Sequence, residues 1–398
     1  MTHKNMININ NHPIWKQISP AKKPFHRARF FLAKQYAKTM QQDAFIGITG
    51  SVGKTTTTKA CQLVLSQKFN TISTVSDLDP VLNIPLTILK KTPKVEKVIM
   101  EMGIEYPGEM EYYLSYIKPA TAIVTRISIA HSEFLGSVDQ IAQEKGQLIK
   151  DLPKNGTAIL NYDDPLVRQL SEKTEAAVVY YGFNEKHCHV WASNIRLQNF
   201  QTKFELNYGV ERVEIESKLL GRHHIYPLLA AAALGINEGV SLLQVKKALE
   251  QMESPEHRLQ VIPGHNDSIL LDDTYNSSPA AVNEALETLN ELPARRRIAV
   301  LGEMRELGSF SENAHRDVAR KLYKDKVDLV ILGGGDAKFI EEELVNLGFI
   351  PERVESGLSN PQIVAKLLKI LAKGDVVLIK ASRLIRMDEI VKKIGRGR

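Results

Sequence analysis

Short apolar segments alternate with stretches of helical periodicity through the first half of the chain. AFIGITG, KVIMEMG and ATAIVTRI have the length and apolar character of buried strands, and residues 55–67 have the pattern of a helix. Further helical patterns lie between and after these strands. Strands that alternate with helices are typical of a mostly parallel sheet with helices on both faces. The pattern therefore predicts an α/β domain.

The pattern changes twice further along the chain. Residues 175–217 alternate polar and apolar positions, which predicts a small part of half-exposed antiparallel strands. GRHHIYPLLAAAALGI then returns to helix, and a second series of strands follows in SILLDD, RRIAVLG, VDLVILGG and DVVLIK. PEHRLQVIPG, with two prolines and a glycine, marks the boundary. We therefore predict a central α/β domain at residues 45–258 and a C-terminal α/β domain at residues 259–398.

The first 44 residues differ from both domains. A helix is predicted over residues 25–40, because apolar positions recur every three or four residues with basic side chains alongside. The apolar positions are Phe25, Ala28, Leu32, Tyr36 and Met40, and the basic ones are Arg27, Arg29, Lys34 and Lys38. One interpretation is a helix that docks on the main domain with its basic face in water. The other is a segment, residues 16–40, that contacts an anionic membrane surface or an anionic substrate.

Composition narrows the class of protein. A length of 398 residues predicts two or three domains. The sequence has no run of about 18 apolar residues of the kind that spans a membrane, and its start lacks the apolar region of a secretory signal. The two cysteines, Cys61 and Cys188, form no disulfide framework, which favours buried thiols and a cytoplasmic location.

The positive charge is confined to the N-terminus. Residues 1–42 contain eight of the 52 Lys and Arg residues and no acidic residue, so the remainder has 44 basic against 46 acidic side chains. The folded domains are therefore not expected to present a basic surface that binds nucleic acid.

A glycine-rich segment, GITGSVGKTTT, leads from the first predicted strand into a helix. A common phosphate loop has glycine five residues before Gly53, where this chain has Ile48. The strand–turn–helix setting still favours ATP or GTP binding, because glycines let the backbone approach phosphates and a helix N-terminus attracts them. Lys54 can neutralise the phosphate oxygens and the Thr55 hydroxyl can bind Mg²⁺. The predicted phosphate-binding residues are Gly50, Ser51, Val52, Gly53, Lys54, Thr55 and Thr56.

Polar residues follow the second and third predicted strands. Glu101 ends the second strand, and His131 and Glu133 come after the third. Because ligands collect at the carboxyl edge of parallel sheets, Glu101 is expected to hold Mg²⁺ directly or through water, with a capping carboxylate as the alternative. His131 is equally consistent with a structural and a functional role. Lys145 lies on the next helix, where composition alone predicts a surface lysine.

Nine motifs, in this order, resemble those of the Mur ligase family. They are GITGSVGKTTT, EMGIEYPGEM, AHSEFLGSVDQIAQEKGQL, LNYDDP, GRHHIYPLLAAAAL, HRLQV, DDTYNSSP, VLGEMRELG and VLIKASRLIRMDEIV. The resemblance covers about residues 45–395, and so many motifs in one order exclude a chance match. It implies a Mur ligase-like central P-loop ATPase domain with a parallel sheet and a small β part. A Rossmann-like C-terminal α/β domain is implied to follow.

The resemblance also implies a reaction. ATP phosphorylates a peptide carboxylate, an amine attacks the acyl phosphate, and ADP and phosphate leave. A carboxylate is a poor electrophile, and phosphorylation turns its oxygen into a leaving group while Mg²⁺ and Lys54 absorb the charge. The motifs are most similar to the family members that add D-alanyl-D-alanine to a cell-wall peptide precursor. The expected partners are therefore a peptide carboxylate and an amino acid or dipeptide amine, and the chain is expected to be a monomer or weak dimer.

Individual residues receive roles from the same resemblance. The implied catalytic residues are Lys54, His131 and Lys145. The positions that surround one or two Mg²⁺ ions are Thr55, Glu101, His131 and Lys145. Lys145 matches a lysine that is often carbamylated. A carbamate is an anion that could bind a second Mg²⁺. The resemblance therefore reverses the interpretation of Lys145 as a surface residue. The positions where the C-terminal domain closes over the nucleotide and excludes water are Arg258, Asp273, Tyr275 and Asn276.

Several features depart from the family pattern. Only about 44 residues precede the phosphate loop, so the usual N-terminal domain for a uridine diphosphate sugar is expected to be missing, shortened or replaced. His224 and Pro227 stand where asparagines usually help to hold the base, Arg126 replaces an asparagine, and EYPGE replaces NHPGE. Two alternatives therefore stay open. One is the same chemistry on a carboxylate without uridine diphosphate, such as a cofactor, pseudomurein-type peptide or poly-amino-acid precursor. The other is a non-catalytic ATP-binding protein at the membrane face.

Overall fold

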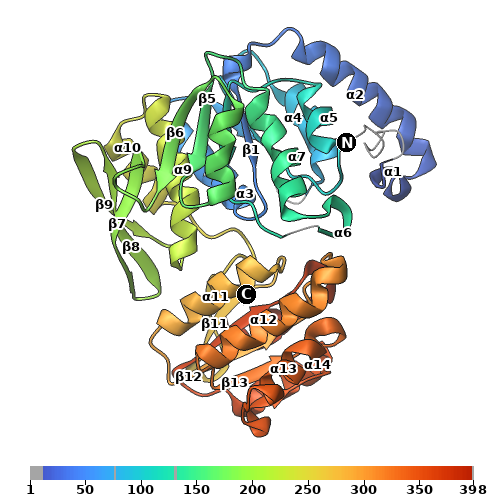
Figure 1. Ribbon diagram of the computed structural model, residues 1–398, viewed down its shortest axis with the longest axis vertical. Helices are drawn as coiled ribbons and strands as arrows, with labels where there is room; N and C mark the ends of the chain where they lie inside the picture. The colour runs from blue at the N-terminus through green and yellow to red at the C-terminus, as the bar shows by residue number, and fades with distance from the viewer. Residues whose placement is uncertain (1–11, 76–77, 130–131, 397–398) are drawn as a thin grey trace.

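A central and a C-terminal α/β domain make up most of the computed structural model, which describes residues 12–75, 78–129 and 132–396 (Figure 1). The central sheet has the strand order β2-β3-β1-β4-β5-β6-β7-β8-β9. Neighbours from β2 to β7 run parallel, and β7, β8 and β9 are antiparallel. The strands are β1 (Phe45–Thr49), β2 (Thr71–Ser73), β3 (Lys97–Glu101), β4 (Thr121–Val124), β5 (Thr157–Asn161), β6 (Ala177–Gly182), β7 (Val190–Gln198), β8 (Gln201–Tyr208) and β9 (Glu211–Ser217).

The direction of β6 differs from the prediction. This strand was expected in the antiparallel part, but it runs parallel to β5, with Ile159 aligned to Val179. Its residues from Val178 to Tyr180 are half-buried, whereas Tyr181 and Gly182 are buried. A half-buried strand at the end of a parallel sheet can therefore resemble an antiparallel strand in its sequence pattern.

Helices cover both faces of the central sheet, and the side chains of each strand alternate between them. Ile46 and Ile48 of β1 share a core with one group of helices, whereas Phe45 shares a core with the other. The first group is α3 (Lys54–Leu65), α9 (Ile225–Asn237) and α10 (Leu242–Glu250). The second is α4 (Pro80–Lys90), α5 (Glu109–Leu114) and α7 (Val138–Lys150). Two short helices are α6 (Ser132–Leu135) and α8 (Pro165–Arg168).

The C-terminal sheet has the strand order β10-β11-β15-β12-β13-β14, with only β10 antiparallel to its neighbour. Its strands are β10 (Gln260–Pro263), β11 (Ile269–Asp273), β12 (Arg296–Leu301), β13 (Leu329–Leu332), β14 (Val354–Glu355) and β15 (Asp375–Lys380). The four predicted strands are present, and the edge strands β10 and β14 were not predicted. The helices are α11 (Pro279–Glu291), α12 (Ser311–Lys324), α13 (Lys338–Asn346), α14 (Asn360–Ile370) and α15 (Asp388–Ile394).

The N-terminal segment forms α1 (Ile14–Gln17) and α2 (Lys23–Ala37), and α2 packs against α4. The helix docks on the central domain, but not through Phe25 and Leu32, the large apolar side chains that the docking interpretation places there. Ala33 and Ala37 are buried against the domain, whereas Phe25 and Leu32 are 73% and 57% exposed. Phe30 and, just after the helix, Met40 also pack against the core of this domain, so the segment contacts the domain through Phe30, Ala33, Ala37 and Met40.

The two cysteines are free and buried, as predicted. Burial raises the pKa of Cys188 to about 12 and also raises the pKa of Cys61, so neither thiol is activated as a nucleophile. Within the described ranges, every helix is too short or too polar to cross a lipid bilayer.

Candidate active site

The turn between β1 and α3 requires glycine at two positions. Gly50 has a φ of +148°, and a Cβ atom there would overlap the hydroxyl of Thr125. Gly53 has a φ of +84° and immediately precedes α3. These conformations bring the turn close to the carboxyl edge of the sheet. The first amides of α3 have no partner within the helix, and together with its positive dipole end they form an anion site.

Hydrogen bonds hold this turn against the segment that follows β4. The Ser51 amide donates to the Arg126 carbonyl at 2.6 Å, and the Ser51 hydroxyl donates to the Ser128 carbonyl at 2.9 Å. The Thr125 hydroxyl donates to the Val52 carbonyl at 2.6 Å. These bonds use the Ser51 amide and the Val52 carbonyl to fix the turn, so the amides that remain for a phosphate are those at the start of α3.

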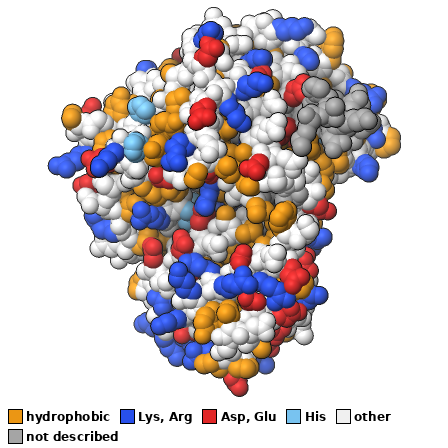
Figure 2. All heavy atoms as spheres, viewed as in Figure 1, with side chains coloured by type: hydrophobic (Ala, Val, Ile, Leu, Met, Phe, Trp, Pro, Cys, Tyr) orange, Lys and Arg blue, Asp and Glu red, His pale blue; other side chains and the backbone are white. Residues whose placement is uncertain are grey.

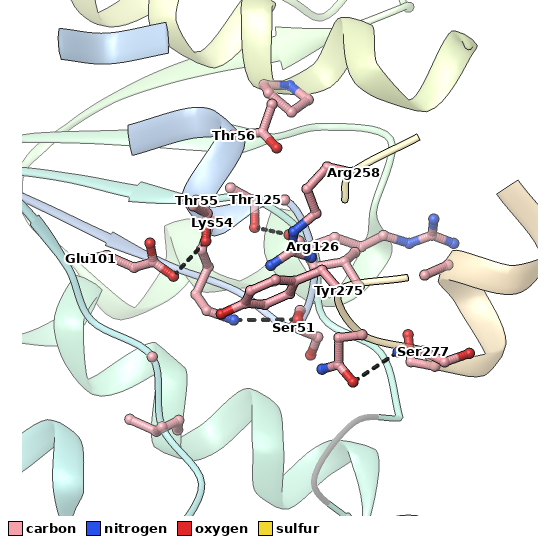
Figure 3. A pocket seen from close by; sticks show the side chains of 18 of the residues that line it. Ser51, Lys54, Thr55, Thr56, Glu101, Thr125, Arg126, Arg258, Tyr275 and Ser277 are labelled. Carbon is pink, nitrogen blue, oxygen red and sulfur yellow. Dashed lines mark hydrogen bonds between the residues drawn. The ribbon is translucent and has the colours of Figure 1, made fainter. Parts of the chain in front are cut away.

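Lys54, the first residue of α3, lies over the turn (Figure 3). Its Nζ donates to the Gly50 carbonyl at 2.9 Å and to the Ser51 carbonyl at 3.3 Å. Burial lowers the pKa of Lys54, and the Glu101 carboxylate opposes this shift. A bound phosphate would give this ammonium a fully charged partner in place of neutral carbonyls.

Thr55 and Glu101 place two oxygen ligands side by side. The Thr55 hydroxyl donates to Glu101 Oε1 at 3.1 Å, from the start of α3 to the end of β3. Mg²⁺ in nucleotide sites is bound by one or two protein oxygens together with phosphate oxygens and water, so this pair fits the ion. Over the described residues, no three His, Cys, Asp or Glu side chains converge as a metal site made by protein alone. Thr55 and Glu101 would therefore hold Mg²⁺ jointly with the nucleotide.

A cavity of about 440 Å³ lies between this turn and the C-terminal domain. Residues 51–56 line it from the central domain. The predicted residues on the opposite side are Arg258, Asp273, Tyr275 and Asn276. The Arg258 guanidinium stacks on the Tyr275 ring, with 3.9 Å from Cζ to the ring centroid, and both point toward the phosphate turn in Figure 3. The structure thus brings residues from distant parts of the chain around one cavity, and their individual roles stay predictions.

Lys380 is a cavity residue that the sequence analysis missed. It ends β15 in register with Asp273 of β11 and is 2% exposed. Its Nζ donates to Asp273 Oδ2 at 2.6 Å and to the Asn276 carbonyl at 2.8 Å. The buried ion pair therefore fixes the segment after β11 at the cavity. The sequence feature that could have identified Lys380 is its position as a charged residue at the carboxyl end of the largely apolar strand DVVLIK.

Lys145 is buried next to the site without lining the cavity. It is 2% exposed and lies on the face of α7 that also buries Ile141 and Leu148. The surface position inferred from composition is therefore wrong, and the helical spacing to these two residues was the signal. Burial lowers the pKa of Lys145 well below its ordinary value, and the Lys54 ammonium adds to the shift. His131, the other implied catalytic residue, lies outside the described residues.

The N-terminal segment supports one wall of the cavity, formed by residues 103–109. The buried Glu109 carboxylate accepts hydrogen bonds from the amides of Glu105 at 2.6 Å and Tyr106 at 3.1 Å. Its other oxygen is 2.6 Å from Nε2 of His12, whose ring also contacts Tyr106 edge-on. His12 therefore positions the carboxylate that shapes this wall.

Replacing His12 by Leu is expected to destabilise the protein by ~1–3 kcal/mol, because Glu109 would lose a partner while it remains buried. The change is also expected to raise the KM of the substrate bound beside residues 103–109 more than it lowers kcat. Urea unfolding and steady-state kinetics measure the two effects. His12→Gln keeps a hydrogen-bonding nitrogen and is the control; equal losses in both variants would contradict this role.

Two neutral histidines line the cavity: His223, which matches the histidine of the family pattern, and His224, which replaces an asparagine. His223 and His224 line the cavity beside Tyr226 and Pro227, and His224 Nδ1 is 2.7 Å from the Leu220 carbonyl. Burial lowers the pKa of His223 to about 4 and that of His224 to about 3. This part of the wall therefore offers uncharged hydrogen-bonding groups near neutral pH, which suits a nucleotide base.

Arg126 forms an ion pair between the two domains. It follows β4 and pairs with Glu284 of α11. Burial raises the pKa of Glu284, and the Arg126 guanidinium opposes this shift. The pair therefore stabilises the arrangement in which the two domains face each other and together enclose the cavity.

Replacing Glu284 by Gln is expected to raise the KM for ATP by up to about fivefold. A partly exposed ion pair contributes ~1 kcal/mol or less, and about 1.4 kcal/mol corresponds to tenfold. Steady-state kinetics and small-angle scattering would report the KM and the opening of the domains. The charge swap R126E/E284R is expected to restore the KM, and a swap that leaves it raised would contradict a role for the charges.

The fold and the site together define a class. The chain has three features of a two-domain P-loop enzyme. They are a glycine-containing turn at the carboxyl edge of a parallel sheet, an adjacent hydroxyl–carboxylate pair, and a second α/β domain across a cavity.

Comparisons with known proteins give the family. Residues 48–235 match the Mur ligase middle domain, and residues 257–383 match the Mur ligase, glutamate ligase domain. The chain is 30% identical to the UDP-N-acetylmuramoyl-tripeptide–D-alanyl-D-alanine ligase of Escherichia coli (strain K12), over 88% of this chain and 76% of that enzyme. The chain belongs to the Mur ligase family, whose members are ATP-dependent ligases.

MurF is the short name of the UDP-N-acetylmuramoyl-tripeptide–D-alanyl-D-alanine ligase, and solved structures of MurF share the fold of this chain. MurF from Acinetobacter baumannii superposes with a TM-score of 0.83 at 24% identity, covering 92% of this chain and 80% of that chain. MurF from Thermotoga maritima in complex with ADP gives a TM-score of 0.81 at 23% identity, covering 92% and 83%. The predicted fold and the predicted resemblance to this branch of the family are confirmed.

Proposed function

We propose that this protein joins D-alanyl-D-alanine, or a similar amine, to the peptide carboxylate of a uridine diphosphate-linked cell-wall precursor, in the cytoplasm and at the expense of ATP. The observation that carries the proposal is the convergence of Lys54, Thr55 and Glu101 with Arg258 and Tyr275 around one cavity. The substrate pair comes from the name that the E. coli and Bacillus subtilis relatives share.

The phosphate turn would bind ATP, and Lys54 would neutralise the charge that develops on the transferred phosphoryl group. The acceptor carboxylate oxygen forms a bond to the γ-phosphorus, the bond to the β-phosphate oxygen breaks, and ADP leaves. The amine then attacks the carbonyl carbon of the acyl phosphate. Phosphate leaves with the C–O bond electrons, and the nitrogen loses a proton. Mg²⁺ held by Thr55 and Glu101 would supply Lewis-acid polarisation of the phosphoryl oxygens.

The C-terminal domain would protect the reactive intermediate. An acyl phosphate is lost if water reaches it before the amine does. Arg258 and Tyr275 line the cavity opposite the phosphate turn, and the Lys380–Asp273 pair holds the segment that carries Tyr275. Closure of the two domains would therefore complete the site and exclude water in one step.

A carbamate on Lys145 belongs to the same proposal. A neutral amine reacts with carbon dioxide, and the lowered pKa of Lys145 increases its neutral fraction. The resulting anion would relieve the repulsion from Lys54 and could hold a second Mg²⁺. His131 keeps its implied role beside the metal as a prediction.

The test is ADP release and product mass with purified full-length chain, ATP and D-alanyl-D-alanine. The acceptors are the uridine diphosphate-linked tripeptide precursor and the same peptide without uridine diphosphate. Ligation of the linked acceptor alone is expected. Faster ligation of the unlinked peptide would favour the alternative with another carboxylate. ATP binding without ADP release from any pair would instead support a non-catalytic nucleotide-binding protein. Light scattering would decide between monomer and dimer.

A further inference from the structure

Helix α2 presents large apolar side chains to solvent. Phe25, Phe31 and Leu32 are 73%, 64% and 57% exposed. They lie on the side of the helix opposite to Ala33 and Ala37, which pack on the central domain. A contiguous group of exposed apolar side chains on one helix face indicates a contact surface.

Basic side chains border this apolar face on both sides. At 3.6 residues per turn, one edge carries three of them and the other edge two. The first edge has Arg27, Lys34 and Lys38, and the second has Lys22 and Arg29. The described residues from 12 to 42 include no Asp or Glu. Figure 2 shows hydrophobic and basic side chains next to one another along the upper right rim, where α2 lies in Figure 1.

The charges on α2 act on its surroundings. Burial lowers the pKa of His26, and Arg29 and Lys22 lower it further. The surface of α2 therefore carries a positive potential that acidic side chains of its own segment do not cancel, and an anionic partner would complement it.

We propose that α2 docks on an anionic lipid bilayer, with Phe25, Phe31 and Leu32 inserted at the interface and the flanking cations against the headgroup phosphates. An apolar helix face with cations along both edges fits a flat surface that is apolar below and anionic above. A second copy of the chain fits less well, because two such faces would bring like charges together at both edges. The helix lies at the end of the molecule away from the C-terminal domain, so docking would leave the cavity open to substrates (Figure 1).

Flotation of the full-length chain with lipid vesicles tests this proposal independently of the ligase reaction. Binding is expected with vesicles that contain phosphatidylglycerol and not with vesicles of phosphatidylcholine alone. Raising the salt from ~0.15 M to ~1 M is expected to release the chain, because the Debye length falls from ~8 Å to ~3 Å. The variant K34Q/K38Q is expected to bind about fivefold more weakly for each cation removed. The variant F25S/F31S/L32S is expected to lose about tenfold or more.

The chain offers a matched control for the apolar variant. Val210, between β8 and β9, and Leu243, on α10, are 102% and 71% exposed. These elements lie at the other end of the central domain from α2 (Figure 1), so V210S/L243S is expected to bind vesicles like the unchanged chain. Thermal unfolding checks that each variant is folded. Unchanged binding by F25S/F31S/L32S, or equal binding to neutral vesicles, would overturn the proposal. Two other outcomes would also overturn it, because the partner of α2 would then be a polypeptide. One is dimerisation through Phe25, Phe31 and Leu32 without vesicle binding. The other is binding to soluble poly-glutamate that depends on the same three residues.

Discussion

Replacing Lys54 by Ala is expected to lower kcat for ADP formation by about 100- to 1000-fold, the loss typical for removal of one preorganised group that stabilises transition-state charge. Lys54 begins α3 and lies over the phosphate turn, where its ammonium donates to the carbonyls of Gly50 and Ser51. A bound γ-phosphate would be the strongest partner available to it, and the charge on that group shifts during transfer. The KM for ATP is expected to rise as well, because the same ammonium contacts the ground state. Single-turnover kinetics with labelled ATP would separate the two effects.

Lys59 offers a matched control on the same helix. It is exposed and lies away from the cavity, so Lys59→Ala is expected to keep kcat and KM. Lys54→Arg keeps a positive charge with a different shape and is expected to recover only part of the loss. A Lys54→Ala variant that stays folded and retains kcat within a few fold would contradict the placement of ATP in this turn.

The phosphate turn could be predicted from the sequence because its determinants are local. Gly50, Gly53 and Lys54 lie within a few residues of one another, and the strand and helix around them have clear periodicities. The positive φ of Gly50 and Gly53 is a conformation that glycine adopts readily, so the sequence of this segment permits the turn, and the contact with Thr125 then excludes a side chain at Gly50. Local physics therefore fixes the turn even with Ile48 at an unusual position.

The contacts between distant segments could not be predicted in the same way. Lys380 meets Asp273 because β15 lies between β11 and β12, an order that periodicity does not contain. Arg126 meets Glu284 only because the two domains face each other across the cavity. Both pairs depend on strand order and domain arrangement, which the spacing of apolar residues leaves open.

Two errors share one cause, which is the use of size and charge to predict burial. In α2 the docking interpretation places the large side chains Phe25 and Leu32 against the domain, but Ala33 and Ala37 are the buried residues. In α7 the charge of Lys145 predicted exposure, but the residue lies on the buried face. Local rules fail most often where a surface serves another contact or where a site needs a buried polar group.

Replacing Lys145 by Ala is expected to lower the rate of ADP formation by at least about 10- to 100-fold, the range found when the shell around a catalytic metal is disturbed. If Lys145 carries a carbamate, the variant loses an anion near Lys54 and a ligand for a second Mg²⁺. A small carboxylate such as formate is expected to restore part of the rate in this variant and none in Lys54→Ala. Lys150→Ala, an exposed lysine on the same helix, is the control. In the unchanged protein, ¹³C-bicarbonate is expected to give a carbamate signal in the NMR spectrum that Lys145→Ala lacks.

The lowered pKa of Lys145 also gives this prediction a pH dependence with a definite sign. Only the neutral amine attacks carbon dioxide, so at limiting bicarbonate the carbamate signal and the rate should fall together as the pH drops through the lowered pKa. Without bicarbonate, and between the lowered pKa and the ordinary lysine pKa, Lys145 is protonated in the unfolded chain and neutral in the folded chain. The free energy of unfolding should therefore rise with pH up to the ordinary lysine pKa. Lys145→Met should abolish this rise, because it leaves no amine to protonate. Two results would place the functional anion elsewhere. One is a carbamate signal that is the same in the unchanged protein and in Lys145→Met. The other is a rate that keeps its full value after bicarbonate is removed.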